Sequence, residues 1–94
     1  MQELLEKVKL DLKIKHTSLD DDVKDQISAC LQDLQATAGI KTSDTTDPLI
    51  IQAVKLYCRA WYKTEQMEIY QNRYDTLKAS LQMATGYGRD NAQN

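Results

Sequence analysis

The chain has 94 residues, of which 41% are hydrophobic and 28% charged, so it is long enough for one small domain and too short for two. Its net charge of −2 argues against a free-standing nucleic-acid-binding protein, because such proteins usually carry a basic excess. Residues 1–15 interleave charged and apolar side chains, unlike a signal peptide, and no run approaches the roughly 20 apolar residues of a membrane span. We therefore expect a cytosolic chain with reduced thiols and no membrane partner.

Apolar residues recur at helical spacing over about residues 2–14, 18–38, 48–63 and 65–84, and no strand-like alternation is present. The sequence therefore predicts an all-α fold, a small bundle of four helices. The bundle forms a single domain at 1–84, and a polar C-terminal tail follows at 85–94.

The first predicted helix, 2–14, carries two apolar surfaces. Its main face is formed by Leu4, Leu5, Val8 and Leu12. Leu10 and Ile14 fall on the opposite side and form a second, smaller apolar spot.

The second predicted helix, 18–38, begins at Ser18 as the N-cap, and three aspartates lie in its first turn, where the helix dipole favours negative charge. Gly39 is the expected stop. The polar loop 40–46 follows. The apolar stripe of this helix is formed by Val23, Ile27, Leu31, Leu34 and Ala38.

The third predicted helix has the sequence DPLIIQAVKLYCRAWY, with Asp47 as the cap and Pro48 in the first turn. It is apolar over most of its circumference, so it is either the central helix of the bundle or a helix sandwiched between copies. Its polar stripe is formed by Gln52, Lys55, Arg59 and Lys63.

The fourth predicted helix, 65–84, has one apolar face and ends before Gly86. That face is formed by Met67, Tyr70, Tyr74, Leu77, Leu81 and Ala84.

Catalytic and metal-binding patterns are weak. The one histidine, His16, lies in a predicted loop, and Cys30 and Cys58 fall on or beside apolar stripes, where buried thiols are inert. One histidine and two distant cysteines do not supply a zinc site, and the aspartates at 20–22 lack the loop pattern of a calcium site. We expect no enzyme activity, no metal and no cofactor.

Two features instead suggest contact between copies. Residues 16–47 have a net charge of −5 and the remainder of the chain +3, which suits head-to-tail contact. The basic stripe could meet the acidic second helix of a neighbouring copy, touch phosphates or simply be solvated. A single four-helix domain would also leave apolar residues exposed, and we expect these to form an interface: Leu10, Ile14, Leu49 or Leu56, Ile69 and Met83.

Four segments carry a resemblance to a known family. They are LLEKVKLDLKI, TSLDDDVKDQISACLQDLQATAGI, DPLIIQAVKLYCRAWY and YQNRYDTLKASLQMATGY. In order and spacing, over roughly residues 3–87, the chain resembles the head–tail connector (adaptor, or head-completion) proteins of long-tailed double-stranded DNA phages and prophages. These are packing motifs, not catalytic ones.

The resemblance implies a structural virion protein at the head–tail interface, assembled in the host bacterial cytoplasm. It implies a homo-oligomeric ring, expected as a dodecamer, that binds the portal protein, extends the DNA channel with transient non-specific DNA contact, and docks the stopper or tail-completion protein. The tail would reach the portal, with Tyr87, Arg89, Asp90 and Asn91 as candidates. The candidate subunit-interface residues are Leu10, Ile14, Asp21, Asp22, Asp25, Leu49, Leu56, Lys55, Arg59 and Lys63.

The alternative is a small helical DNA-binding or regulatory protein that uses the face formed by Lys55, Arg59 and Lys63. The loop before the third helix is longer than that of a usual helix-turn-helix motif, which weakens this alternative.

Overall fold

The computed structural model describes residues 1–42 and 45–84. The regular elements of these residues are all helical: α1 (Gln2–Leu12), α2 (Asp20–Ala38), α3 (Pro48–Tyr62), a 3₁₀ turn η1 (Thr64–Gln66) and α4 (Met67–Met83). The predicted all-α bundle of four helices is confirmed. The expected boundary between the domain and the tail stays a prediction, because residues 85–94 lie outside the described part.

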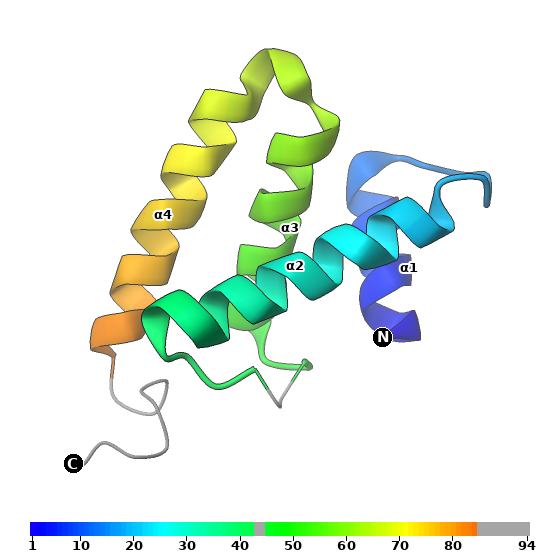
Figure 1. Cartoon of the computed structure of the whole chain (residues 1–94). Coiled ribbons are helices and arrows are strands. Elements are labelled where there is room, and N and C mark those ends of the chain that lie inside the picture. Colours follow the sequence, from blue (N-terminus) through cyan, green and yellow to red (C-terminus); the bar gives the residue numbers. More distant parts are fainter. Residues whose placement is uncertain (43–44, 85–94) are drawn as a thin grey trace.

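α3 is the hub of the bundle. It runs antiparallel to α4, to which η1 joins it, while α2 crosses α3 and α1 lies away from α4 (Figure 1). α3 contacts the other three helices, whereas α1 and α4 do not touch within the described residues. Its apolar circumference is explained by this position, which was the first of the two predicted places for this helix.

One continuous core joins the four helices. Its fully buried large side chains come from every helix and include Leu4, Val8, Ile27, Leu34, Ile50, Val54 and Leu81. The described residues therefore form a complete hydrophobic core in a single copy, without help from a partner.

Two helices end in the same way, and each ending buries an isoleucine. Lys13 and Gly39 adopt the left-handed conformation, with φ of 62° and 66°. The next amide then bonds back to a carbonyl of the last turns, from Ile14 to Lys9, five residues back, at 2.9 Å and from Ile40 to Leu34, six residues back, at 3.0 Å. This left-handed helix ending turns the following residue back onto the core. Ile14 is 6% exposed and Ile40 1%.

Two of the four helix starts, Gln2 and Pro48, agree with the sequence, and the other two differ. Asp47 caps α3 as predicted, accepting a hydrogen bond from the Leu49 amide at 2.8 Å. Ser18 is not the cap of α2, because its hydroxyl lies 2.7 Å from His16 Nδ1 and the helix begins only at Asp20. The fourth helix starts at Met67, since the chain first forms the tight turn η1.

α4 is the least buried of the longer helices. Only Tyr74 and Leu81 are buried, and Met67 and Ala84 of its predicted apolar face are exposed. The reason is that α4 packs along α3 and against one part of α2, so its outer half faces away from the bundle.

Candidate functional site

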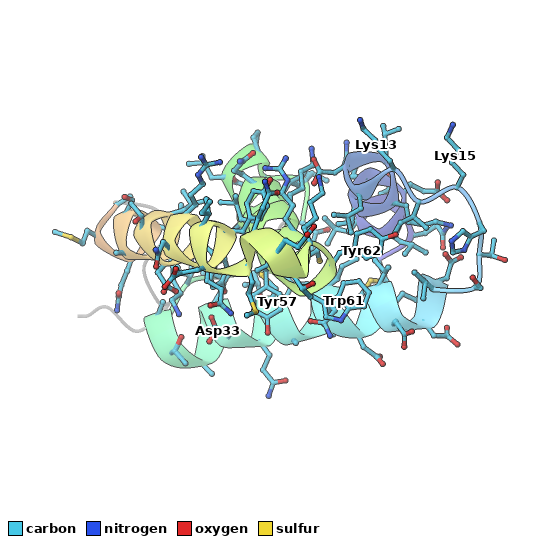
Figure 2. The ribbon with its side chains drawn as sticks, turned by 90° about the horizontal axis from the view of Figure 1, so that it is seen from above. Lys13, Lys15, Asp33, Tyr57, Trp61 and Tyr62 are labelled. Atoms are coloured by element: carbon cyan, nitrogen blue, oxygen red, sulfur yellow. The ribbon has the colours of Figure 1, made fainter. Side chains whose placement is uncertain are left out.

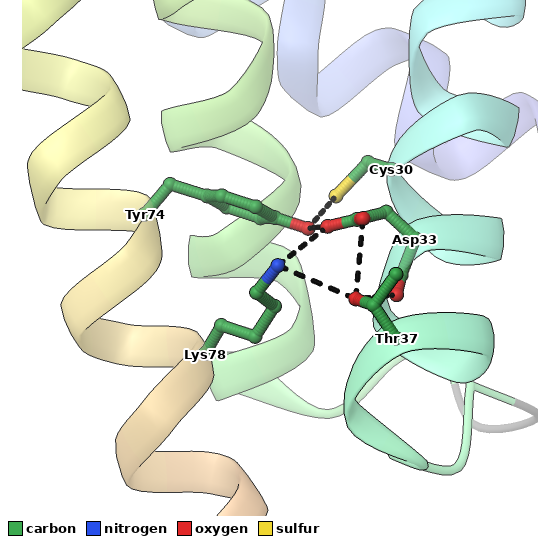
Figure 3. A network of polar contacts seen from close by, with 5 residues as sticks. All are labelled: Cys30, Asp33, Thr37, Tyr74 and Lys78. Atoms are coloured by element: carbon green, nitrogen blue, oxygen red, sulfur yellow. Dashed lines mark hydrogen bonds and ion pairs between the residues drawn. The ribbon is translucent and has the colours of Figure 1, made fainter.

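A polar network fastens α4 to α2 (Figure 3). The Tyr74 hydroxyl donates a hydrogen bond to Asp33 Oδ2 at 2.6 Å, and Lys78 Nζ contacts the same oxygen at 3.0 Å. Thr37 bonds the other carboxylate oxygen at 3.2 Å, and Cys30 Sγ lies 3.8 Å from the Tyr74 hydroxyl. We call these five residues the α2–α4 latch. Tyr74 and Lys78 bond Asp33 across the two helices, whereas the Thr37 hydroxyl donates to Asp33 within α2.

The latch shifts the ionisation of its members. Burial alone would raise the pKa of Asp33, but hydrogen bonds from Tyr74 and Lys78 outweigh it and leave that pKa lowered. Burial and the bond to the Asp33 carboxylate raise the pKa of Tyr74. Asp33 is therefore held ionised and Tyr74 neutral, which is the state in which the hydroxyl donates to the carboxylate.

A second polar contact ties α1 to α3. Arg59 Nε and Nη2 donate to the two carboxylate oxygens of Asp11 at 2.8 and 2.6 Å, a two-pronged pair of the strong kind. The hydrogen bond from Arg59 outweighs burial, and the charges of Lys55 and Lys63 act in the same direction, so the pKa of Asp11 is lowered.

This ion pair corrects the predicted basic stripe. Lys55, Arg59 and Lys63 do share one side of α3, but Arg59 is engaged inside the subunit with Asp11. The sequence did not reveal this partner, because Asp11 lies 48 residues away and the pairing depends on how α1 packs on α3. Lys55 and Lys63 keep intermediate exposure.

The predicted acidic residues Asp21, Asp22 and Asp25 are all exposed along the start of α2. Their neighbour Asp20 behaves differently, because Lys9 of α1 contacts its Oδ1 at 2.7 Å. The exposed acidic surface of α2 is therefore formed by Asp21, Asp22 and Asp25 and does not include Asp20.

The expected surplus of apolar surface is present, with two corrections. Leu10 is 81% exposed, Leu49 42%, Ile69 51% and Met83 88%. Ile14 and Leu56, however, are buried in the subunit's own core and offer no surface to a partner. Ile14 is buried because the left-handed Lys13 turns it inward, and Leu56 because α1 and α2 both pack on α3.

A groove lies between α2 and α4. It encloses about 430 Å³, and Tyr57 and Trp61 of α3 lie between the two flanking helices, with Asp33 farther along (Figure 2). Tyr57 meets the Tyr74 ring edge-to-face, at a centroid distance of 5.2 Å. We call it the α2–α4 groove, and it is lined by Gln26, Asp33, Tyr57, Ala60, Trp61, Met67, Gln71, Tyr74, Asp75 and Lys78.

Both cysteines are buried and unpaired, as the sequence indicated. Burial raises the pKa of Cys30 to about 12 and that of Cys58 to about 12. Thiols with such a pKa hold almost no thiolate near neutral pH, so they are poor nucleophiles and poor metal ligands in the folded protein.

The part of the chain that the structure describes brings no metal-binding constellation together. Within residues 1–42 and 45–84, no group of three or more histidine, cysteine, aspartate or glutamate side chains is placed to hold a metal ion. His16, rather than facing a cysteine, lies beside Ser18 in the exposed turn before α2. None of the helices in the described ranges has the length and apolar character needed to cross a membrane.

Asp33, Lys78 and Asp75 were missed by reasoning from the sequence. Asp33 and Thr37 are one turn apart on α2, and Lys78 is one turn after Tyr74, which is a weak signal of a polar contact. The candidate portal contacts Tyr87, Arg89, Asp90 and Asn91 lie outside the described residues.

The fold and its surfaces define a small all-helical protein suited to contact with other proteins: its polar clusters hold its own helices, and its apolar tips and groove face outward. A family model described as phage connector protein matches residues 4–88, and the chain belongs to this family. Membership gives it a structural head–tail connector role, contact with other phage head or tail proteins and a place in the virion. No curated protein and no solved structure matches the chain.

Proposed function

We propose that the chain is a ring-forming adaptor. Copies assemble on the portal of the DNA-filled head, extend its DNA channel and provide the docking surface for the stopper or tail-completion protein. One observation carries the proposal: a single copy completes its core, yet Leu10 of α1 and Met83 of α4 remain 81% and 88% exposed. Apolar tips on two separate helices are what a subunit with a neighbour on each side needs.

The distribution of charge supports contact between unlike surfaces. Asp21, Asp22 and Asp25 are exposed on α2, and Lys55 and Lys63 are partly exposed on α3. Acid on one copy against base on the next favours a single register and opposes wrong pairings. Arg59 is not an interface residue in this proposal, because it is paired with Asp11 of its own subunit.

The alternative function, a DNA-binding regulator, has less support. Its binding face would need Lys55, Arg59 and Lys63 together, and Arg59 is bound to Asp11 through Nε and Nη2. We assign Lys55 and Lys63 at most a weak contact with DNA passing through the channel. The dodecamer and the contact of residues 85–94 with the portal stay predictions.

The first experiment is the solution mass by light scattering over a concentration series, with negative-stain images of any large species. Rings of uniform size are the expected result. A monomer at every concentration contradicts self-driven assembly, and mixing with purified portal protein then tests templated assembly. Absence of binding to the portal in that mixture would overturn the adaptor proposal.

A further inference from the structure

We infer that the α2–α4 groove of one copy receives the end of α1 from the next copy. The inserted part is the apolar tip Leu10 with the two lysines that follow it, Lys13 and Lys15; we call these three residues the α1 knob. This inference rests on the proposed ring and specifies which two surfaces meet in it.

The groove combines an aromatic floor with acidic edges. Tyr57, Ala60 and Trp61 of α3 line it from below. On α4 the exposed residues Glu68, Gln71 and Asp75 follow one edge at spacings of three and four residues, and Gln71 and Asp75 line the groove.

The edge on α2 is built in the same way. Asp22, Gln26 and Asp33 follow one line along the helix, and Gln26 and Asp33 line the groove. Lys78 is the cation of the lining, and its ammonium is already bound to Asp33. The negative charge offered to a ligand therefore comes from Asp75 and Glu68 on α4 and from Asp22 on α2. The site therefore fits a ligand with an apolar tip and positive charge around it.

The α1 knob has that composition. Leu10 is 81% exposed, and Lys13 and Lys15, three and five residues later in the sequence, are exposed as well. The acids nearest in sequence are already engaged, since Asp11 is bound by Arg59 and Glu6 accepts a hydrogen bond from Gln2. The knob also has a fixed shape, because the left-handed turn at Lys13 ends the helix there.

Three other exposed apolar residues, Leu49, Ile69 and Met83, lack neighbouring lysines of this kind. One turn from Met83 and from Leu49 stand uncharged residues, Ala79 and Ala53 among them. Ile69 has Arg73 one turn later, but that guanidinium lies over the Tyr70 ring at 5.9 Å. Leu10 is therefore the apolar tip whose charges match the groove.

The two surfaces lie on different sides of the molecule. In Figure 2, Lys13 and Lys15 point away from the bundle on the side opposite α2, while Tyr57 and Trp61 lie toward α2. A copy therefore cannot fill its own groove with its own knob. Two unlike patches on separate sides produce a head-to-tail contact, which closes into a ring when the rotation between copies allows it.

The test exchanges the charges of the two surfaces. Lys13→Glu with Lys15→Glu makes the knob acidic, and Glu68→Lys with Asp75→Lys makes one edge of the groove basic. Each variant alone sets like charges against each other, so the concentration needed for assembly should rise about tenfold or more. In an equal mixture every knob can find a groove of opposite sign, and assembly should return to the wild-type range.

A control for the knob variant carries the same change of net charge elsewhere. Lys24→Glu with Arg73→Glu should assemble like the wild type. Light scattering reports mass, and circular dichroism checks that each variant keeps its helices. Failure of the mixture to assemble when both variants are folded overturns the inference, and so does equal loss in the control.

A second measurement does not depend on ring closure. Glu6→Cys, one turn before Leu10, takes a spin label, whereas Cys30 and Cys58 are buried and do not. When this spin-labelled variant is mixed with ¹⁵N-labelled wild-type protein that carries no spin label, the label should broaden the amide signals of Tyr57, Trp61 and Gln71. If rings form but the broadened signals lie outside the groove, the adaptor proposal is retained and this contact is overturned. Broadening in the groove without rings supports the contact and counts against self-driven assembly. If neither rings nor broadening in the groove are observed, this contact is overturned and self-driven assembly is contradicted.

Discussion

At the scale of single residues, Tyr74 of α4 makes both an apolar contact with α3 and a polar contact with α2. Its ring packs edge-to-face on Tyr57 at 5.2 Å between centroids, and its hydroxyl donates to Asp33 at 2.6 Å. It is also one of the two buried residues of α4. The apolar spacing of the sequence predicts its burial, whereas its hydrogen bond depends on the crossing of α2 and α4.

Replacing Tyr74 with phenylalanine keeps the ring and removes the donor. The carboxylate of Asp33 then loses one of its bonds in a partly buried place, so the free energy of unfolding should fall by about 1–3 kcal/mol. Urea unfolding followed by circular dichroism measures this change. Tyr62→Phe is the control, because Tyr62 is 40% exposed and its variant should stay within about 0.5 kcal/mol of the wild type. Equal stability of both variants would show that the latch contributes nothing.

Ile14 shows where residue-level reasoning reaches its limit. Its position after Leu10 suggests the outer face if the helix continues, but the helix ends at Leu12. Lys13 takes the left-handed conformation with φ of 62°, a conformation more usual for glycine, and the chain then turns inward. No glycine marks this ending, so the sequence carries no direct sign of it.

At the scale of elements, aspartates make the long-range polar links between helices. Asp33 connects α2 with α4, Asp11 connects α1 with α3, and Asp20 connects α2 with α1. α4 depends on its link more than the other helices, since only Tyr74 and Leu81 of its residues are buried. We therefore expect α4 to be the first helix to separate from the bundle when these aspartates lose their charge.

This dependence predicts weaker folding in acid. The pKa values of Asp11 and Asp33 are lowered from the ordinary 3.8, so the unfolded chain binds these protons more readily than the folded one. Their contribution to stability is complete above the unfolded pKa and is lost as the pH falls through the lower folded values. Urea unfolding at a series of pH values from 7 down to about 2 measures it.

Asp33→Asn separates the latch from general acid effects. The variant should be less stable near neutral pH and should lose part of the decline in acid, because one of the titrating groups is gone. An unchanged slope against pH would assign the acid sensitivity to other carboxylates.

At the scale of the whole molecule, the acidic and basic surfaces are arranged on opposite sides. The exposed aspartates of α2 and the acidic edges of the α2–α4 groove lie on one side, and Lys13 and Lys15 point to the other. This polarity is what distinguishes a subunit for head-to-tail assembly from a self-complementary dimer.

Reversing the basic side of α3 tests the ring against the DNA-binding alternative. Lys55→Glu with Lys63→Glu should weaken assembly, because these residues would face the acidic α2 of a neighbour. Light scattering and a DNA-binding titration at two salt concentrations measure both properties. Unchanged assembly together with loss of salt-sensitive DNA affinity would favour the regulator.

The sequence by itself determined the class of fold, the order of the helices and most of the core, because apolar spacing and a capping residue such as Asp47 act over a few neighbouring positions. It also indicated an exposed Leu10, an exposed Leu49 or Leu56, and buried cysteines. The tertiary structure alone decided the partner of Arg59, the latch around Asp33, the burial of Ile14 and Leu56, and the groove. These depend on how helices cross, and side chains as distant as Asp11 and Arg59 meet only after the helices have packed.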